Sequence, residues 1–303
     1  MESLVAHYLD LWQYQRNLTA HTLRAYRIDL RQFTEFMRNT DGELSKANLS
    51  EYLIHLHKHY QPRTAKRKIA SLKSFCTALL EDEIISENPF SKIRTKFQEP
   101  FCLPKTIPLQ EIQLLFAVAY AELQQTKKGS YAQRKCLRDI AVLELLFATG
   151  MRVSELCSLK TADLNLYEQS LKINGKGSKE RIIHLGNQAV INALKNYEEA
   201  FADKLTPQGY FFLNRLDGRF SEQSVRIMIL KYADKAAIER HLTPHMFRHS
   251  FATLLLEEDV DIRYIQQVLG HSSIVTTQIY THVTSNKQKY ILTAKHPRNR
   301  IKI

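Results

Sequence analysis

The chain has 303 residues, of which 44% are hydrophobic and 24% charged, and its formal net charge is +12. These proportions are ordinary for a globular protein, and the length is sufficient for two domains that each bury a core. No apolar run approaches the roughly 20 residues of a membrane-spanning helix, and the acids near the N-terminus are unlike a signal peptide. The basic charge therefore favours nucleic acid over an acidic membrane as the partner, and we expect a cytoplasmic DNA-binding protein.

The N-terminal part, to about Ile93, shows the periodicity of helices only. Apolar residues recur at three- and four-residue spacing from Leu23 to Met37, and Thr19 is a candidate cap for this helix. A second helix is expected to begin at residue 48 or 50 and to run through residue 60. A third is expected over 62–80, because Pro62 suits a first helical turn, and Asn88 before a proline ends the helical part.

Two basic stripes lie on these expected helices. No acid occurs between Glu51 and Glu81, a stretch that contains Lys58, Arg63, Lys66, Arg67, Lys68 and Lys73. The first amphipathic helix carries a second stripe of Arg24, Arg27 and Arg31. A solvated basic face without a ligand is the alternative, but two stripes in one small domain favour DNA. The residues that we expect to contact DNA are Arg24, Arg27, Arg63, Lys66, Arg67 and Lys73.

Helical periodicity fails between Ser91 and Pro108, where prolines and basic residues accumulate. We interpret 98–108 as a linker between an N-terminal domain, 1–97, and a C-terminal domain, 109–303. The second domain is expected to open with a helix after Pro108, and a further helix is expected to end at Gly150. Between residues 164 and 185 the period changes toward two around G-K-G-S, which predicts a hairpin in a small antiparallel sheet. Helices are expected again from Asn187 onward.

The C-terminal half contains side chains suited to a phosphodiester. Arginine donates paired hydrogen bonds from a planar fork, so it can stabilise the charge that builds on phosphate oxygens in the transition state. Two residues three apart at the start of a helix share a face, and a tyrosine hydroxyl can attack phosphorus. The candidates are Arg152 in A-T-G-M-R-V-S-E-L, Lys176 in N-G-K-G-S-K-E-R, His245 and Arg248 in T-P-H-M-F-R-H-S-F-A-T, His271 in L-G-H-S-S, and Tyr280 in T-T-Q-I-Y-T-H-V.

In this order and with these flanks, the stretch from about Leu137 to Val283 resembles the catalytic half of the tyrosine recombinases, the phage-integrase family. The resemblance implies a mainly α fold. A helical, SAM-like core-binding domain would clamp DNA, and a mostly helical catalytic domain would carry the small antiparallel β-sheet. It also implies that these enzymes cut and rejoin DNA through a 3′-phosphotyrosyl intermediate and a Holliday junction.

The resemblance assigns a role to each candidate. Tyr280 is expected to be the nucleophile, and the phosphate is expected to be held by Arg152, His245, Arg248 and His271. Lys176 resembles the general acid that protonates the 5′-hydroxyl, with Lys179 as the alternative. Glu155 is implied to hold Arg152, although the pair could also be a plain salt bridge on one helix face. His249 is interpreted as structural.

No cofactor is expected, neither ATP nor a metal, because the phosphotyrosyl bond retains the energy of the phosphodiester. The sequence has no P-loop and no cluster of carboxylate ligands, and its four cysteines lack zinc-ligand spacing and are expected to be reduced thiols. The expected partners are double-stranded DNA and further protomers, in a homo- or hetero-tetramer on two DNA sites. The tail after Tyr280 is a candidate for docking on a neighbour. The need for an accessory protein or a partner recombinase is left open.

Several functions fit this chemistry. The chain begins almost directly with the core-binding helices, which favours a compact, Xer-type recombinase that resolves chromosome or plasmid dimers. An integrase of a mobile element with the same build is the alternative. A type IB topoisomerase, which shares the chemistry but acts as a monomer, and a DNA-binding protein with an inactive site are less favoured.

Overall fold

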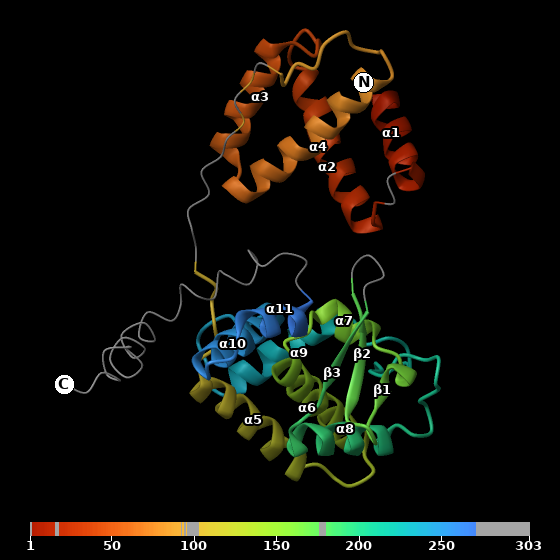
Figure 1. Ribbon diagram of the computed structural model, residues 1–303, viewed down its shortest axis with the longest axis vertical. Helices are drawn as coiled ribbons and strands as arrows, with labels where there is room; N and C mark the ends of the chain where they lie inside the picture. The colour runs from red at the N-terminus through yellow and green to blue at the C-terminus, as the bar shows by residue number, and fades with distance from the viewer. Residues whose placement is uncertain are drawn as a thin grey trace, which may run out of the picture. The chain divides into compact units, whose positions relative to one another are not determined.

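The computed structural model describes residues 2–15, 18–91, 93, 95, 103–175 and 180–270 (Figure 1). The chain divides into two compact units, Met1–Phe101 and Cys102–Ile303. Each unit buries a hydrophobic core of its own. Within the described ranges, no helix combines the length and the apolar character needed to cross a membrane.

The described part of the first unit is helical: α1 (Glu2–Gln15), α2 (Ala20–Met37), α3 (Lys46–His59) and α4 (Pro62–Glu81). The sequence pattern did not delimit α1, which buries Trp12 against the other helices. Thr19 caps α2 as predicted, because its side chain accepts a hydrogen bond from the backbone amide of Thr22. The predicted start of α3 was too late. Ser45 is the N-cap, since its hydroxyl accepts the amide hydrogen bond of Asn48 at 3.2 Å.

A buried carboxylate joins α2 to α4. Asp29 is 1% exposed, and its two oxygens accept hydrogen bonds from Arg67 and from Lys68, the latter at 3.0 Å. Lys68 is itself only 3% exposed, and its ammonium lies 4.6 Å from the centroid of the Tyr60 ring. Lys68 is therefore a core residue, although the sequence places it within a basic run.

The second unit consists mostly of helices. They are α5 (Leu109–Gln124), α6 (Tyr131–Thr149), α7 (Val153–Ser158), the short 3-10 helix η1 (Thr161–Asp163), α8 (Gln188–Ala200), α9 (Glu222–Lys235), α10 (Pro244–Glu257) and α11 (Ile262–Leu269). As predicted, α5 starts directly after Pro108 and α6 ends at Gly150.

The segment before α5 is attached to α10. Ile107 is buried and exchanges hydrogen bonds with Ser250 of α10. The amide of Ile107 donates to the Ser250 hydroxyl at 2.6 Å, and this hydroxyl donates to the Ile107 carbonyl at 3.1 Å.

The predicted hairpin is confirmed. Strands β2 (Ser170–Asn174) and β3 (Glu180–His184) are antiparallel, with Leu171 opposite Ile183, and β1 (Leu164–Asn165) pairs with β2 on its other side. Buried and exposed residues alternate along β2, which is the pattern of a strand with one covered face. Residues 176–179, between β2 and β3, lie outside the described residues.

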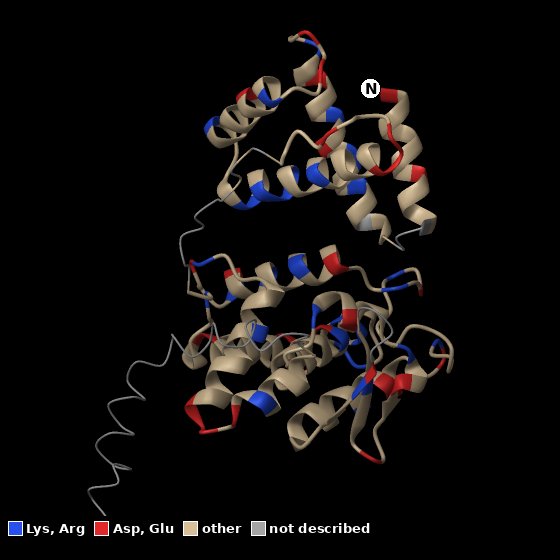
Figure 2. Ribbon diagram, turned by 45° about the horizontal axis from the view of Figure 1, so that its top comes forward, with Lys and Arg blue, Asp and Glu red and all other residues tan. Residues whose placement is uncertain are grey.

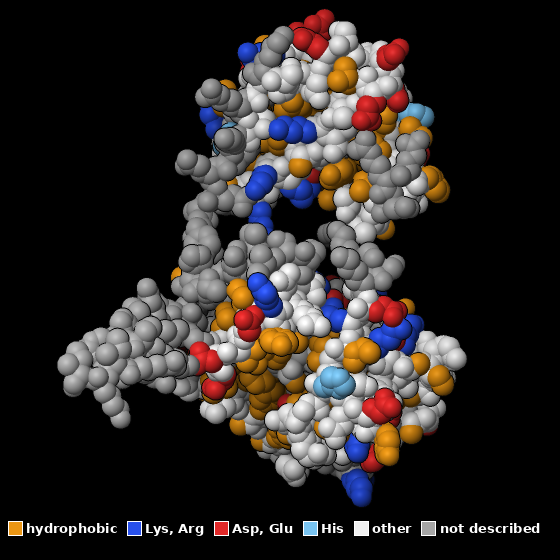
Figure 3. Space-filling model, viewed as in Figure 1, with side chains coloured by type: hydrophobic (Ala, Val, Ile, Leu, Met, Phe, Trp, Pro, Cys, Tyr) orange, Lys and Arg blue, Asp and Glu red, His pale blue; other side chains and the backbone are white. Residues whose placement is uncertain are grey.

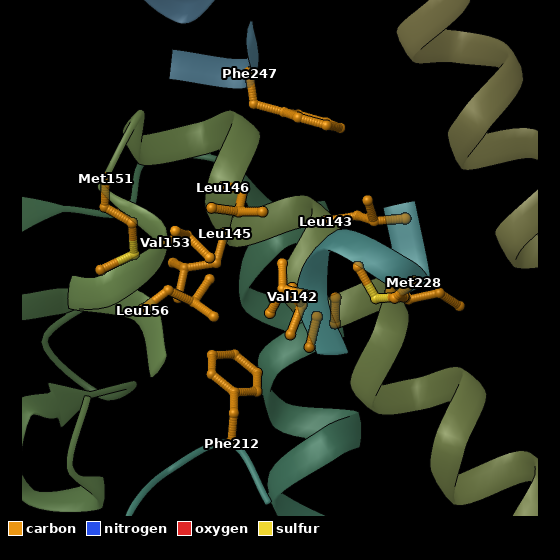
Figure 4. Close-up of a cluster of buried hydrophobic side chains, with 14 of the residues drawn as sticks. Val142, Leu143, Leu145, Leu146, Met151, Val153, Leu156, Phe212, Met228 and Phe247 are labelled. Carbon is orange, nitrogen blue, oxygen red and sulfur yellow. The ribbon is translucent and has the colours of Figure 1, made fainter. Parts of the chain in front are cut away.

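Helix α6 passes through the core of the second unit. Its residues Val142, Leu143, Leu145 and Leu146 are completely buried. Figure 4 shows several of these side chains packed beside Met151, Val153 and Leu156 from the turn and helix that follow, with Phe212 from below and Phe247 from α10. Because packing surrounds the junction between α6 and α7, the residues at this junction have a rigid support.

Replacement of Asp29 by asparagine should lower the free energy of unfolding of the first unit by about 3–5 kcal/mol, because Lys68 would remain buried without a counter-charge. Urea titration followed by the fluorescence of Trp12, the single tryptophan, measures this unit. The control is Glu35→Gln, which removes the exposed ion pair of Glu35 with Arg31 on the same helix and should cost less than about 0.5 kcal/mol. Equal effects of the two variants would contradict the role assigned to Asp29.

Candidate active site

The turn between α6 and α7 places Arg152 at the surface. Gly150 ends α6 with φ of +57°, a left-handed conformation that favours glycine. A Cβ atom here would also lie 2.5 Å from Cδ1 of Phe251 and 2.9 Å from Cδ2 of Leu269, so this turn packs tightly against α10 and α11. The following Met151 is buried, whereas the side chain of Arg152 is 36% exposed. The turn thus anchors Met151 in the core and leaves the side chain of Arg152 accessible to solvent.

Glu155 fixes the position of Arg152, as the resemblance implied. Its Oε1 accepts a hydrogen bond from Nη1 of Arg152 at 2.8 Å, and its Oε2 accepts one from the Arg152 backbone amide at 2.9 Å. Burial alone would raise the pKa of Glu155, but hydrogen bonds from Arg181 and from Arg152 outweigh it and lower the pKa. Glu155 is therefore a buried, ionised carboxylate.

Helix α10 brings His245 and Arg248 to the same region. Pro244 occupies the first turn, His245 is exposed, and Arg248 is only 4% exposed. Arg248 donates from Nη1 to the carbonyl of Gly150 and from Nη2 to the carbonyl of Leu269, both at 2.8 Å. Arg248 thus binds the turn that carries Arg152 and the end of α11 at once.

His249, the next residue of α10, is partly buried. Burial, together with the nearby charges of His245 and Arg248, lowers its pKa from 6.5 to about 4. The ring is therefore uncharged near neutral pH, which agrees with a structural rather than a phosphate-binding residue.

The remaining predicted residues of the site are not placed by the structure. Lys176 and its alternative Lys179 lie outside the described residues, between β2 and β3. His271 and Tyr280 also lie outside them, after Gly270 at the end of α11. The structure thus brings Arg248 to the turn that carries Arg152, with His245 three residues before Arg248 on α10, and the catalytic roles of all these residues stay predictions.

Sequence reasoning missed Arg181 on β3. Its side chain is 11% exposed and forms a two-pronged ion pair with Glu155, with Nη1 3.1 Å from Oε1 and Nη2 2.8 Å from Oε2. Its Nε donates to the carbonyl of Val268 at 2.8 Å. Gly270 ends α11 with φ of +65°, which favours glycine, and a Cβ atom there would lie 2.9 Å from Nη1 of Arg181. The sequence held no distinctive signal for this role, because an arginine on a short predicted strand is common.

The residues expected to contact DNA lie on α2 and α4. Arg24, Arg27, Arg63 and Lys66 are exposed, and Figure 2 shows basic residues recurring along α4. The side chain of Arg67 is 43% exposed and is oriented by its ion pair with Asp29. Lys73 is half-buried, with its ammonium on the hydroxyl of Thr95 and 5.6 Å from the centroid of the Phe90 ring. Lys73 would have to leave these contacts to reach a phosphate.

The site is suited to an anion. The positive charges of Arg152, Arg181 and Arg248 exceed the negative charge of Glu155, so this group of residues keeps a positive charge. Arginine stays ionised at all physiological pH values and presents its donors in a plane, as a phosphoryl group requires. A helical unit with basic faces and a second unit with such a site define a class of proteins that act on the phosphodiester backbone of DNA.

Comparison with known proteins identifies the family. Residues 114–287 match the phage integrase family, and residues 5–83 match the phage integrase N-terminal SAM-like domain. The chain is 48% identical over 299 residues to a tyrosine recombinase of Agathobacter rectalis, covering 98% of this chain and 97% of the relative. It is 36% identical over 308 residues to tyrosine recombinase XerC of Bacillus pumilus, covering 98% and 97%. The fold resembles XerH site-specific recombinase bound to a palindromic difH substrate after cleavage, with a TM-score of 0.76 and 22% identity, covering 92% and 81%.

This chain belongs to the phage integrase family, the tyrosine recombinases. Enzymes of this family cleave and rejoin DNA through a phosphotyrosine intermediate. The expected mainly helical architecture, with a SAM-like N-terminal domain and a small antiparallel sheet in the second unit, is confirmed.

Acidification should destabilise the second unit through His249. The unfolded chain protonates this residue near pH 6.5 and the folded chain near pH 4, so the unfolded state binds more protons between these values. The stability contributed by the neutral ring is therefore complete above pH 6.5 and is lost as the pH falls toward 4. Scanning calorimetry should show a smaller loss of melting temperature between pH 7 and 5 for His249→Gln than for the wild type. The control His241→Gln, at an exposed residue before α10, should follow the wild type, and equal behaviour of both variants would contradict the assignment.

Proposed function

We propose that this protein is a Xer-type site-specific recombinase that acts in the cytoplasm on double-stranded DNA and resolves chromosome or plasmid dimers. The observation that carries the proposal is the placement of Arg152 and Arg248 at one rigid turn, with His245 on the same helix as Arg248. Support also comes from the match along nearly the whole length to a relative named XerC.

In the proposed reaction, the hydroxyl of Tyr280 attacks the scissile phosphorus and loses its proton to solvent water. The bond to the 5′-oxygen breaks, and Lys176 supplies the proton that converts this oxygen to a 5′-hydroxyl. Charge that builds on the non-bridging oxygens is stabilised by Arg152, His245, Arg248 and His271. The DNA 3′ end is then esterified to tyrosine, and attack by the 5′-hydroxyl of another strand reverses the chemistry and joins exchanged strands. No ATP or metal takes part in these steps.

The first unit is proposed to hold the duplex. Its exposed basic residues on α2 and α4 can neutralise phosphates and so fix the register of the enzyme on DNA. The ion pair of Arg67 with the buried Asp29 limits the freedom of this guanidinium, which lowers the entropy lost when it binds a phosphate. We assign the contacts to Arg24, Arg27, Arg63, Lys66, Arg67 and Lys73.

Two DNA sites and four protomers are proposed to form the working assembly, of one protein or of two related ones. A groove of about 460 Å³ lies on the second unit, and Figure 3 shows hydrophobic side chains gathered on this face. Its lining comes from α5, α6, α8, α10 and the end of β3, and includes Phe116, Phe147, Phe251 and the acids Glu144 and Glu258. The tail over 286–303 combines an apolar stretch with many basic residues, which complements this groove in polarity and charge. We assign the groove to the tail of a neighbouring protomer.

Replacement of Tyr280 by phenylalanine should abolish covalent attachment to DNA and leave DNA binding unchanged, because only the attacking oxygen is removed. A nicked, labelled substrate that traps the cleaved state, resolved on a denaturing gel, measures the adduct. The matched control is Tyr264→Phe, at an exposed tyrosine of α11, which should form the adduct like the wild type. An adduct formed by Tyr280→Phe would refute the assignment of the nucleophile.

Filling the groove should weaken the assembly of protomers on DNA. Ala189 is exposed and lines the groove, so Ala189→Arg places bulk and positive charge there without disturbing the core. Mass photometry of protein with a two-site duplex should show binding to single sites but fewer tetramers. Gln188→Arg, the adjacent exposed residue of α8 outside the groove, should assemble like the wild type. Tetramers formed equally by both variants would exclude this groove as the docking site.

A further inference from the structure

Arg181 and Arg248 bind consecutive carbonyls at the end of α11. Arg181 donates to Val268 and Arg248 donates to Leu269, each at 2.8 Å. The last carbonyls of a helix have no partner inside the helix and carry partial negative charge, so two guanidiniums are well placed there. The two arginines come from different elements, β3 and α10, and they join these elements to α11.

The same two arginines also contact the turn that carries Arg152, Arg248 directly and Arg181 through Glu155. Arg248 donates to the carbonyl of Gly150, two residues before Arg152. Arg181 binds Glu155, which holds both the side chain and the backbone amide of Arg152. The contacts therefore close a ring from Arg152 through Glu155, Arg181, the end of α11 and Arg248 back to the turn at Gly150.

Arg181 determines the orientation in which the Glu155 carboxylate binds Arg152. Oε1 of Glu155 accepts from Nη1 of Arg152 and from Nη1 of Arg181, and Oε2 accepts from the Arg152 amide and from Nη2 of Arg181. Each carboxylate oxygen thus receives one hydrogen bond from each arginine. A planar fork that binds both oxygens fixes the plane of the carboxylate, which a single-point contact does not do.

We propose that Arg181 is a positioning residue for the phosphate clamp, holding Arg152 through Glu155 and holding Arg248 through the end of α11. Arg181 acts through its protein contacts, because Nε, Nη1 and Nη2 of its guanidinium each already donate to Val268 or Glu155. A misplacement of about 1 Å at a reacting group can cost on the order of 100-fold in rate, so the ring controls cleavage rather than binding. This inference rests on the proposed function, since it assigns the clamp to the scissile phosphate.

The test compares Arg181→Gln and Arg181→Lys with the wild type in single-turnover cleavage of the nicked substrate. Arg181→Gln should reduce the cleavage rate by about 100-fold and change the DNA dissociation constant less than about threefold. Loss of the counter-charge should also let Glu155 take up a proton at higher pH, which moves the acid limb of the rate profile upward. Arg181→Lys keeps the charge but lacks the fork, so it should restore the acid limb and recover only part of the rate.

The matched control is Arg219→Gln. Nε of Arg219 donates to the carbonyl of Cys157 at the end of α7, at 2.9 Å, and Arg219 is outside the ring. This variant should cleave with the wild-type pH profile. Wild-type cleavage by Arg181→Gln would overturn the inference. A second result would also overturn it. In that result, the loss of cleavage rate matches the loss of folded protein measured by calorimetry, and the pH profile is unshifted in both Arg181 variants. A wild-type protein that forms no covalent adduct would instead refute the proposed function.

Discussion

A single ionised carboxylate, buried between two arginines, determines the geometry of the catalytic unit. Glu155 is 7% exposed, and a negative charge at such a position is tolerated only where hydrogen bonds and counter-charges replace water. Arg152, three residues before Glu155, and Arg181, 26 residues after it, supply both. Because the carboxylate would be unstable without them, the fold and the proposed phosphate clamp depend on the same contacts.

The first unit uses the same device for a different purpose. Asp29 is buried and holds Lys68 in the core and Arg67 at the surface. Lys68 stabilises the packing of α2 on α4, and Arg67 is held by the same carboxylate with its side chain at the surface. In both units, a carboxylate that water does not reach orients a guanidinium that we assign to DNA.

The sequence predicted those features that depend on local signals. Caps and breakers such as Thr19, Pro108 and Gly150 predicted element ends correctly, and the change of period predicted the hairpin. The pairing of Glu155 with Arg152 could also be predicted, because the two residues are three apart.

Contacts between residues remote in sequence could not be predicted. The partner of Arg181 is remote in sequence, and an arginine on a short strand has no distinctive pattern. The burial of Lys68 was missed for the same reason, because only the position of Asp29 on another helix distinguishes it from its basic neighbours. Lys176, His271 and Tyr280 lie outside the described residues, and their roles rest on the motifs alone.

The reciprocal hydrogen bonds between Ile107 and Ser250 decide where the catalytic unit can be separated from the rest of the chain. Ile107 precedes α5, so a fragment trimmed to the first helical residue would lose a side chain that belongs to the core and two bonds to the middle of α10. Since Arg248 lies two residues before Ser250 on α10, such trimming would also disturb the candidate active site. A fragment that begins at Leu103 keeps this anchor, and limited proteolysis of the whole chain should spare the peptide bonds next to Ile107 for the same reason.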